Sequence, residues 1–118
     1  MPTFYCYSRC STCKKAAKWL AAHQVEVKTI DLVETPPAAA DLERWITANP
    51  DHNLRYFFNT SGQHYRQQGL KDKLGQLTVK EAAALLASDG KLIKRPLMVD
   101  GDHVTCGFKE EVYEQEWL

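Results

Sequence analysis

The chain has 118 residues, of which 44% are hydrophobic and 25% are charged. This composition is typical of a globular protein, and the length suits one domain, residues 1–118, with a core that needs no disulfide staples. Fifteen basic and fifteen acidic residues give a net charge of zero, so charge favours neither nucleic acid nor a membrane surface as a partner.

The N-terminus lacks the pattern of a signal peptide, and no apolar run reaches the roughly 18 residues that a membrane helix needs. We therefore expect a cytoplasmic protein. Four cysteines in that compartment more often serve catalysis or metal binding than structural bridges.

The first third of the chain reads as strand, helix, strand. Residues 3–7 are short and rich in aromatic side chains, as strands are. From Ser11 to about His23, residues recur at helical spacing along a largely apolar stripe, at Cys13, Ala16, Ala17, Leu20 and Gln24. Residues 25–32 alternate and predict a second strand. Such a βαβ unit places its two strands parallel.

Helices are expected in the middle of the chain. Two prolines at 36–37 open a helix that ends at the Asn-Pro pair of residues 49–50. Residues 51–77 are expected to be irregular with short helices. Thr78 and Glu81 match a capping box, which predicts a helix that ends at the following Asp-Gly pair.

The last part of the chain predicts a hairpin and a short helix. Residues 97–99 and 103–106 flank Asp100-Gly101, a strong signal for a tight turn. Residues 110–118 are expected to form the final helix. The element order predicts an α/β fold with thioredoxin-like topology: a four-stranded mixed sheet with an inserted helical region.

The stretch "YSRCSTCKKAA" carries the candidate chemistry. Cys10 is expected at the N-terminus of the first helix, where free N–H groups and the helix dipole stabilise a thiolate. Arg9, Lys14 and Lys15 add positive charge nearby, and the thiolate is the nucleophile. Cys13 lies on the apolar stripe. We predict that Cys10 attacks, that Cys13 resolves the adduct, and that the two form a reversible disulfide.

Two other readings of the cysteines stay open. A zinc half-site would need Cys6 and Cys106 to lie near the pair, because structural zinc takes four ligands. An inert buried pair is the second, because free cysteine is often a core residue. Redox chemistry is favoured, and Cys6 and Cys106 are expected to be packing residues in apolar strands. The four histidines are expected at the surface.

The same helix N-terminus can hold an anion. The amides of Ser11, Thr12 and Cys13 are expected to cradle an oxyanion or the carboxylate of a thiol substrate. Arg95 precedes the third strand, at a corner that faces the cysteines in this topology. The simpler reading of Arg95 is a solvated surface charge. The loop at residues 59–62 is expected to enter a helix, with Ser61 as its cap.

The segments "YSRCSTCKKAAKWL", "FFNTSGQHYR" and "IKRPLMVDGDHVTCGFKEE" resemble the ArsC-type arsenate reductase and Spx family. The resemblance implies a thioredoxin-like fold with a helical insertion and a cis bond between Arg95 and Pro96. Reductases of this family attack arsenate with the first cysteine and are recharged by glutathione and glutaredoxin. The Spx branch binds the alpha subunit of RNA polymerase and uses the C-x-x-C motif as a thiol switch.

The resemblance is incomplete at the anion pocket. The arsenate reductases hold the oxyanion with three arginines; Arg95 matches one, and Asn59 and Gly107 stand where the others would be. Against Spx, the chain ends in the acidic "EQEWL" and has no basic C-terminal extension.

Two functional hypotheses follow. The first is a thiol-dependent reductase that acts on an oxyanion or a glutathione-type disulfide, with no bound cofactor or metal and with glutathione, glutaredoxin or thioredoxin as electron donor. Its anion-binding residues are expected to include Arg9, Lys14, Asn59 and Pro96 as well as the helix amides. The alternative is a redox-sensing regulator that binds RNA polymerase. Neither requires direct contact with nucleic acid or a membrane.

Overall fold

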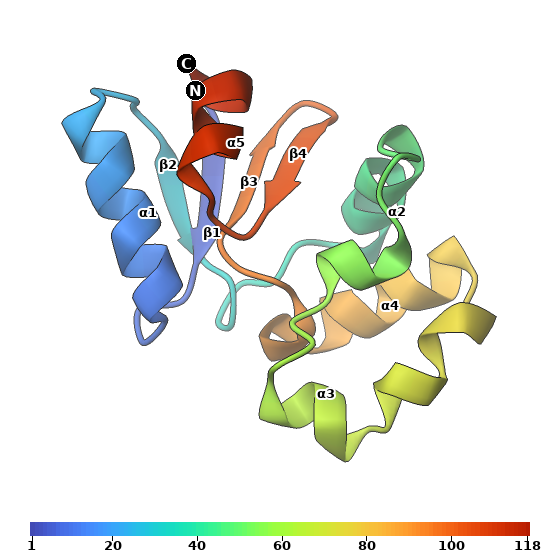
Figure 1. Ribbon diagram of the computed structural model, residues 1–118. Helices are drawn as coiled ribbons and strands as arrows, with labels where there is room; N and C mark the ends of the chain where they lie inside the picture. Colours follow the sequence, from blue (N-terminus) through green and yellow to red (C-terminus); the bar gives the residue numbers. More distant parts are fainter.

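A computed structural model describes all 118 residues, and its centre is a four-stranded sheet (Figure 1). The strand order is β2-β1-β3-β4, with bounds Thr3–Cys6 for β1, Lys28–Asp31 for β2, Leu97–Asp100 for β3 and His103–Cys106 for β4. β1 runs parallel to β2 and antiparallel to β3, and β3 pairs antiparallel with β4. The predicted mixed sheet with its βαβ unit and hairpin is confirmed.

Helices cover the sheet in two groups. α1 (Ser11–Ala22) and α5 (Glu110–Trp117) lie over one face, and the inserted region holds α2 (Ala39–Ala48), α3 (Gln63–Gln67) and α4 (Val79–Ser88). Short 3-10 turns link the inserted helices: η1 (Leu54–Phe57), η2 (Leu70–Asp72), η3 (Leu74–Gln76) and η4 (Gly90–Leu92). None of the helices combines the length and apolar character needed to cross a membrane.

The two groups bury two separate cores. The core beneath α1 and α5 has six buried residues, among them Phe4 of β1 and Met98 of β3. The other has 18 and joins the opposite side of β3 to the inserted helices. Alternation along the strands explains the division, because successive side chains point to opposite faces. Phe4 and Cys6 therefore face α1, whereas Tyr5 packs against the larger core.

Several element boundaries differ from the sequence-based expectation. β2 spans Lys28–Asp31 rather than residues 25–32. α2 begins at Ala39 rather than at the prolines, and the extended Ala38 is its N-cap. Gln24 lies beyond the end of α1 with a positive φ of 58°, so it ends the helix instead of extending its apolar stripe. α3 is preceded by Gly62 as its N-cap, and the Ser61 hydroxyl donates to the Asn59 side chain instead.

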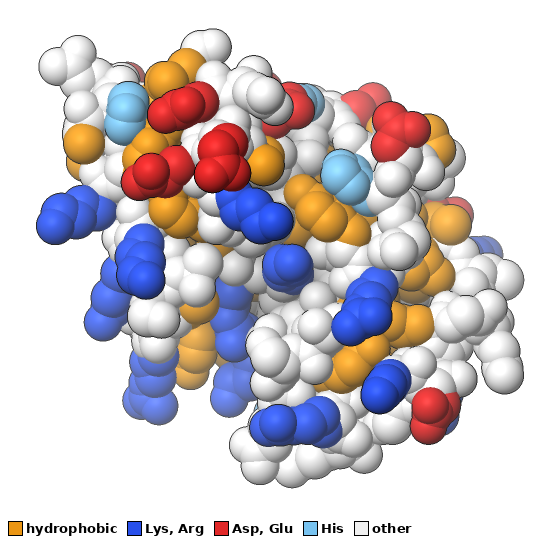
Figure 2. Space-filling model, viewed as in Figure 1, with side chains coloured by type: hydrophobic (Ala, Val, Ile, Leu, Met, Phe, Trp, Pro, Cys, Tyr) orange, Lys and Arg blue, Asp and Glu red, His pale blue; other side chains and the backbone are white.

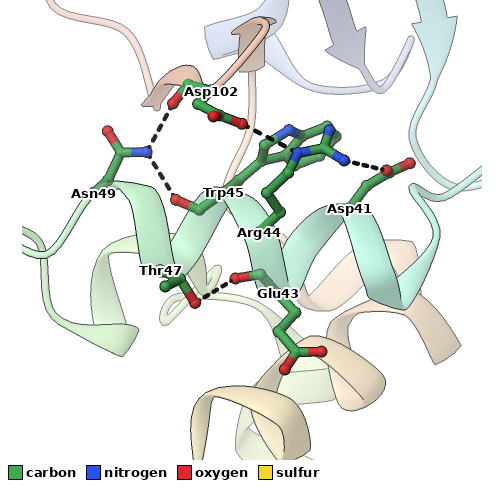
Figure 3. A network of polar contacts seen from close by, with 7 residues as sticks. All are labelled: Asp41, Glu43, Arg44, Trp45, Thr47, Asn49 and Asp102. Atoms are coloured by element: carbon green, nitrogen blue, oxygen red, sulfur yellow. Dashed lines mark hydrogen bonds and ion pairs between the residues drawn. The ribbon is translucent and has the colours of Figure 1, made fainter.

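A polar network ties the inserted region to the hairpin (Figure 3). Arg44 of α2 donates through Nε to the Asp102 carboxylate at 3.1 Å and contacts Asp41 of its own helix at 3.3 Å. The Asn49 side chain donates to the backbone carbonyls of Trp45 and Asp102. Because the Arg44 ion pairs are exposed, they add little stability, but together the contacts fix where the end of α2 meets the turn of the hairpin.

Candidate functional site

A cleft of about 940 Å³ runs between the segment from β4 into α5 and the chain before α3. Cys10 and Thr12 from the start of α1, and Arg95 from the approach to β3, line the same cleft. Lys and Arg side chains gather over α1 and the inserted region on the face in Figure 2, whereas Asp and Glu gather near α5. Cys10 thus opens into the same cleft as Arg95.

Cys10 is the N-cap of α1, as predicted. Its backbone is extended (φ −90°, ψ 119°), and no side chain caps the helix. The N–H groups of Ser11, Thr12 and Cys13 have no hydrogen-bond acceptor in the protein, and the first turn carries no acidic residue. The start of α1 therefore keeps its free donors and its positive dipole end for an anion, either the Cys10 thiolate or a substrate group.

Tyr7 joins the separate parts of this site. Its carbonyl accepts the Cys10 N–H at 2.9 Å, and its own N–H lies 3.3 Å from the Cys13 sulfur. The Tyr7 ring lies beneath the Arg95 guanidinium, with 5.1 Å between the guanidinium carbon and the ring centroid. One residue thus positions both cysteines of the motif and the arginine, a role that the sequence signalled only as an aromatic residue before the motif.

Arg95 has donors that the protein does not satisfy. Its Nε and Nη1 atoms are buried and have no hydrogen-bond partner, although the residue is half-buried and lines the cleft. Burying an unpaired donor is costly, so these groups are suited to a ligand with acceptor oxygens. The simpler reading of Arg95 as a solvated surface charge is wrong. The peptide bond from Arg95 to Pro96 is cis, as predicted.

The cysteine pairing differs from the prediction. Cys13 is joined in a disulfide to Cys6, with 5.8 Å between the Cα atoms, and Cys10 is free. Cys6 is therefore not simply a packing residue. The reason is tertiary: strand alternation turns Cys6 toward α1, and the apolar stripe of α1 turns Cys13, 1% exposed, back toward β1.

Lys94 also lines the cleft and brings a second positive charge to it. Lys94 occupies the space beside Gly107, where an added Cβ would meet the Lys94 Cε at 3.0 Å. Its ammonium lies 5.9 Å from the centroid of the Tyr56 ring. The Tyr56 hydroxyl in turn accepts the Cys106 N–H at 2.9 Å. Sequence reasoning passed over Lys94 and Tyr56 because neither belongs to a motif; the Lys-Arg pair before Pro96 was the only signal.

Burial excludes Cys106 as a second nucleophile. It raises the pKa of the Cys106 thiol far above its usual range, although nearby Lys94 opposes the shift. Burial likewise raises the pKa of Tyr56. Cys106 therefore stays a protonated thiol at neutral pH, and the prediction that it packs in a strand is confirmed. No three His, Cys, Asp or Glu side chains converge in a way that could hold a metal ion.

The structure brings together only part of the predicted site. Cys10, Thr12, Asn59 and Arg95 line the cleft, and Gly107 lines it as well. Cys13 and Pro96 are buried beneath it, and the side chains of three candidates, Arg9, Ser11 and Lys14, are exposed and outside its lining. For Ser11 the expected contribution came from the backbone amide, which remains free.

Comparison with known proteins points to one family. The model of the ArsC family matches residues 5–116. The uncharacterized protein YusI of Bacillus subtilis (strain 168) is 48% identical over 115 residues, which cover 98% of this chain and 97% of YusI. The regulatory protein MgsR of the same strain is 30% identical over 106 residues, covering 90% of this chain and 82% of MgsR.

A solved structure shows the same fold. The crystal structure of "a possible arsenate reductase" from Streptococcus mutans UA159 has a TM-score of 0.89 and 47% sequence identity to this chain. The match covers 97% of this chain and 98% of the other. The thioredoxin-like sheet and its helical insertion are thus shared along almost the whole length.

Proposed function

The chain belongs to the ArsC family, and we propose that it is a thiol-dependent reductase of small disulfides that carry an anionic group, with Cys10 as nucleophile. The observation that carries this proposal is the pair of buried, unpartnered donors on Arg95 in the cleft that Cys10 enters. A carboxylate on the substrate would pair with the charged guanidinium of Arg95 and accept hydrogen bonds from its N–H donors. The substrate sulfur would then meet the Cys10 thiolate.

The first step exchanges one disulfide for another. The Cys10 thiolate attacks one substrate sulfur, forms a mixed disulfide and releases the other half of the substrate as a thiolate. The free amides at the start of α1 stabilise the attacking anion. A second thiol then attacks the Cys10 sulfur of the mixed disulfide, forms a new disulfide with Cys10 and releases the reduced product. An external thiol such as glutathione, glutaredoxin or thioredoxin reduces that disulfide and restores the protein.

Arsenate is a poor fit to this cleft. A tetrahedral dianion beside a thiolate needs several paired charges, and Arg95 is the only arginine among the residues that line the cleft. Lys94 adds a second positive charge beside Gly107, but an ammonium is a point charge that cannot form a bidentate pair. We expect slow or absent arsenate turnover with glutathione and glutaredoxin supplied.

Three disulfides of similar size test the proposal: dithiodiglycolate, which is anionic, hydroxyethyl disulfide, which is neutral, and cystamine, which is cationic. We expect kcat/KM to fall in that order, and Arg95→Ala to remove the preference. On Cys13→Ser, glutathione disulfide should leave one glutathione on Cys10, located by mass spectrometry. Equal rates for the three substrates, or an adduct on another cysteine, would overturn the proposal.

Similarity to the regulatory protein MgsR favours a second candidate, a regulator, and the resemblance to the Spx branch implies that it would sense redox state and bind RNA polymerase. In that case, the state of the cysteines would control binding instead of turnover. A pull-down with the polymerase alpha subunit, from reduced and from oxidised protein, distinguishes the two functions. Redox-dependent capture together with no turnover of any disulfide would establish the regulator.

A further inference from the structure

We propose that Cys6 is a third redox residue, which takes over the disulfide from Cys10 and leaves the nucleophile free. The inference rests on the proposed role of Cys10 as the attacking thiol. Its observation is the pairing of Cys13 with Cys6, while Cys10 stays a thiol at the cleft. Cys13 is therefore placed between a half-buried partner at the N-cap of its own helix and a partner in β1.

Helix geometry brings Cys13 within reach of Cys10. Cys10 is the N-cap and Cys13 the third residue of α1, so the two form a C-x-x-C pair at a helix start, the arrangement that closes a disulfide in thiol oxidoreductases. The Cα separation of 5.8 Å between Cys6 and Cys13 lies within the range of disulfides. A single buried sulfur, that of Cys13, can thus bond in turn to either neighbour.

The relay balances in atoms and electrons. After Cys10 has attacked the substrate, the Cys13 thiolate attacks the Cys10 sulfur, forms the 10–13 disulfide and releases the product thiolate. The Cys6 thiolate then attacks the Cys13 sulfur, forms the 6–13 disulfide and releases the Cys10 thiolate. The substrate disulfide gains two electrons and two protons and becomes two thiols, and Cys6 and Cys13 lose them.

As a consequence, Cys10 stays a free thiol after the protein has been oxidised. With the disulfide held at 6–13, Cys10 can attack a second substrate, but Cys13 can no longer resolve that adduct. The oxidised protein therefore depends on an external thiol for each further turnover, whereas the reduced protein completes one turnover by itself. Cys106, whose burial keeps it protonated, takes no part.

Disulfide mapping tests the relay without any substrate. Trypsin cleaves after Arg9 and Lys14, so Cys6 falls in peptide 1–9 and both motif cysteines fall in peptide 10–14. Protein is oxidised with diamide to one disulfide per chain, quenched with acid, alkylated with iodoacetamide under denaturing conditions and digested without reduction. We expect peptide 1–9 linked to peptide 10–14, with the alkyl group on Cys10.

Two variants, one test and one control, check this result. Cys6→Ala should give peptide 10–14 with an internal disulfide and no alkylated Cys10, and the control Cys106→Ala should match the wild type. A disulfide between Cys10 and Cys13 within peptide 10–14 of the wild type, with Cys6 alkylated, would overturn the relay. Because diamide replaces the substrate, a protein that reduces no anionic disulfide can still show the 6–13 bridge, and the two proposals fail separately.

The order of events distinguishes a relay from a static bridge. With glutathione disulfide as oxidant, the internally bridged peptide should appear first and the linked peptides later. Cys10→Ser should slow formation of the 6–13 disulfide by about tenfold or more, since the entry thiolate is gone. An unchanged rate in Cys10→Ser would show that Cys6 and Cys13 oxidise directly, and the relay would be wrong.

Discussion

Two helix N-termini in this molecule are built in opposite ways. α4 begins with a complete capping box, in which the Thr78 hydroxyl accepts the Glu81 N–H at 3.1 Å and the Glu81 carboxylate accepts the Thr78 N–H at 2.9 Å. α1 follows Cys10 as its N-cap, with no side-chain cap hydrogen bond and no acidic residue in its first turn.

The difference separates a helix start that serves stability from one that serves chemistry. Capping by Thr78 stabilises α4 against the cost of unpaired donors. At Cys10 the same donors stay unpaired, close to the unsatisfied guanidinium of Arg95. A cysteine is a poor cap, so the first turn of α1 gives up stability and keeps positive potential for an anion. Substitutions at the two starts should therefore affect different quantities.

The largest effect is expected from Cys10→Ser. Serine is a preferred N-cap, so the free energy of unfolding of the reduced protein should not fall. Turnover of dithiodiglycolate should drop by on the order of 10³-fold or more, as in other enzymes that lose their nucleophile. Chemical denaturation under reducing conditions and a steady-state assay measure the two quantities. Residual turnover near the wild-type rate would place the nucleophile elsewhere.

Arg95→Ala should have the next largest effect. Loss of a charged hydrogen-bonding partner costs about 1–3 kcal/mol, which corresponds to a fall in kcat/KM for the anionic disulfide of roughly five- to 150-fold. Arg95→Lys keeps the charge but loses the fork, so it should fall between wild type and alanine. The neutral disulfide is the control substrate and should be affected least. An alanine variant that matches wild type on the anionic substrate would remove Arg95 from the site.

Thr78→Ala should affect stability alone. Removing a threonine cap typically costs about 1 kcal/mol, which lowers the melting temperature of a domain of this size by roughly 4 °C. Turnover per folded molecule should stay unchanged, because Thr78 does not line the cleft. Thr78→Ser retains the hydroxyl and should lie close to wild type. A fall in turnover without a fall in stability would contradict the division between the two helix starts.

Cys10→Asp should stabilise the reduced protein slightly. Aspartate is among the best N-cap residues, and the extended backbone of Cys10 suits a cap, so a gain of about 0.5–1 kcal/mol is expected. The gain should shrink in high salt, because part of it is attraction to the helix dipole and the basic residues nearby. Denaturation at two salt concentrations, with Cys10→Ala as the uncapped control, measures it. Equal stability of the aspartate and alanine variants would mean that the first turn of α1 is already satisfied.

The smallest effect concerns the pH dependence of α4. Hydrogen bonds from the backbone N–H and then the side chain of Thr78 lower the pKa of Glu81. A carboxylate with a lowered folded-state pKa stabilises the fold above its unfolded pKa, and that contribution is lost as pH falls through the folded pKa. Glu81→Gln should therefore be less stable than wild type at neutral pH, and the gap should close below about pH 4. A gap that persists in acid would assign the effect to packing instead.

Local sequence signals predicted much of the fold and the place of the nucleophile. The capping box at Thr78, the Asp100-Gly101 turn and the short aromatic strand before Cys10 each depend on neighbours a few residues away, where steric and hydrogen-bonding preferences act directly. The start of α1 at Cys10 belongs to the same class. The cis bond before Pro96 was predicted from the resemblance of the whole chain, not from local preference.

Only the tertiary structure decided which groups meet. Cys6 and Cys13 pair because strand alternation and the helical stripe turn their side chains toward each other between β1 and α1, and neither pattern alone specifies that contact. Lys94 lies beside Gly107, and Tyr56 holds the Cys106 amide, across 13 and 50 positions of chain. Likewise, two N–H donors of Arg95 are unsatisfied because the folded chain brings no acceptor within hydrogen-bond distance of them. Residue spacing determines local geometry, whereas burial and unmet hydrogen bonds are set by packing of distant segments.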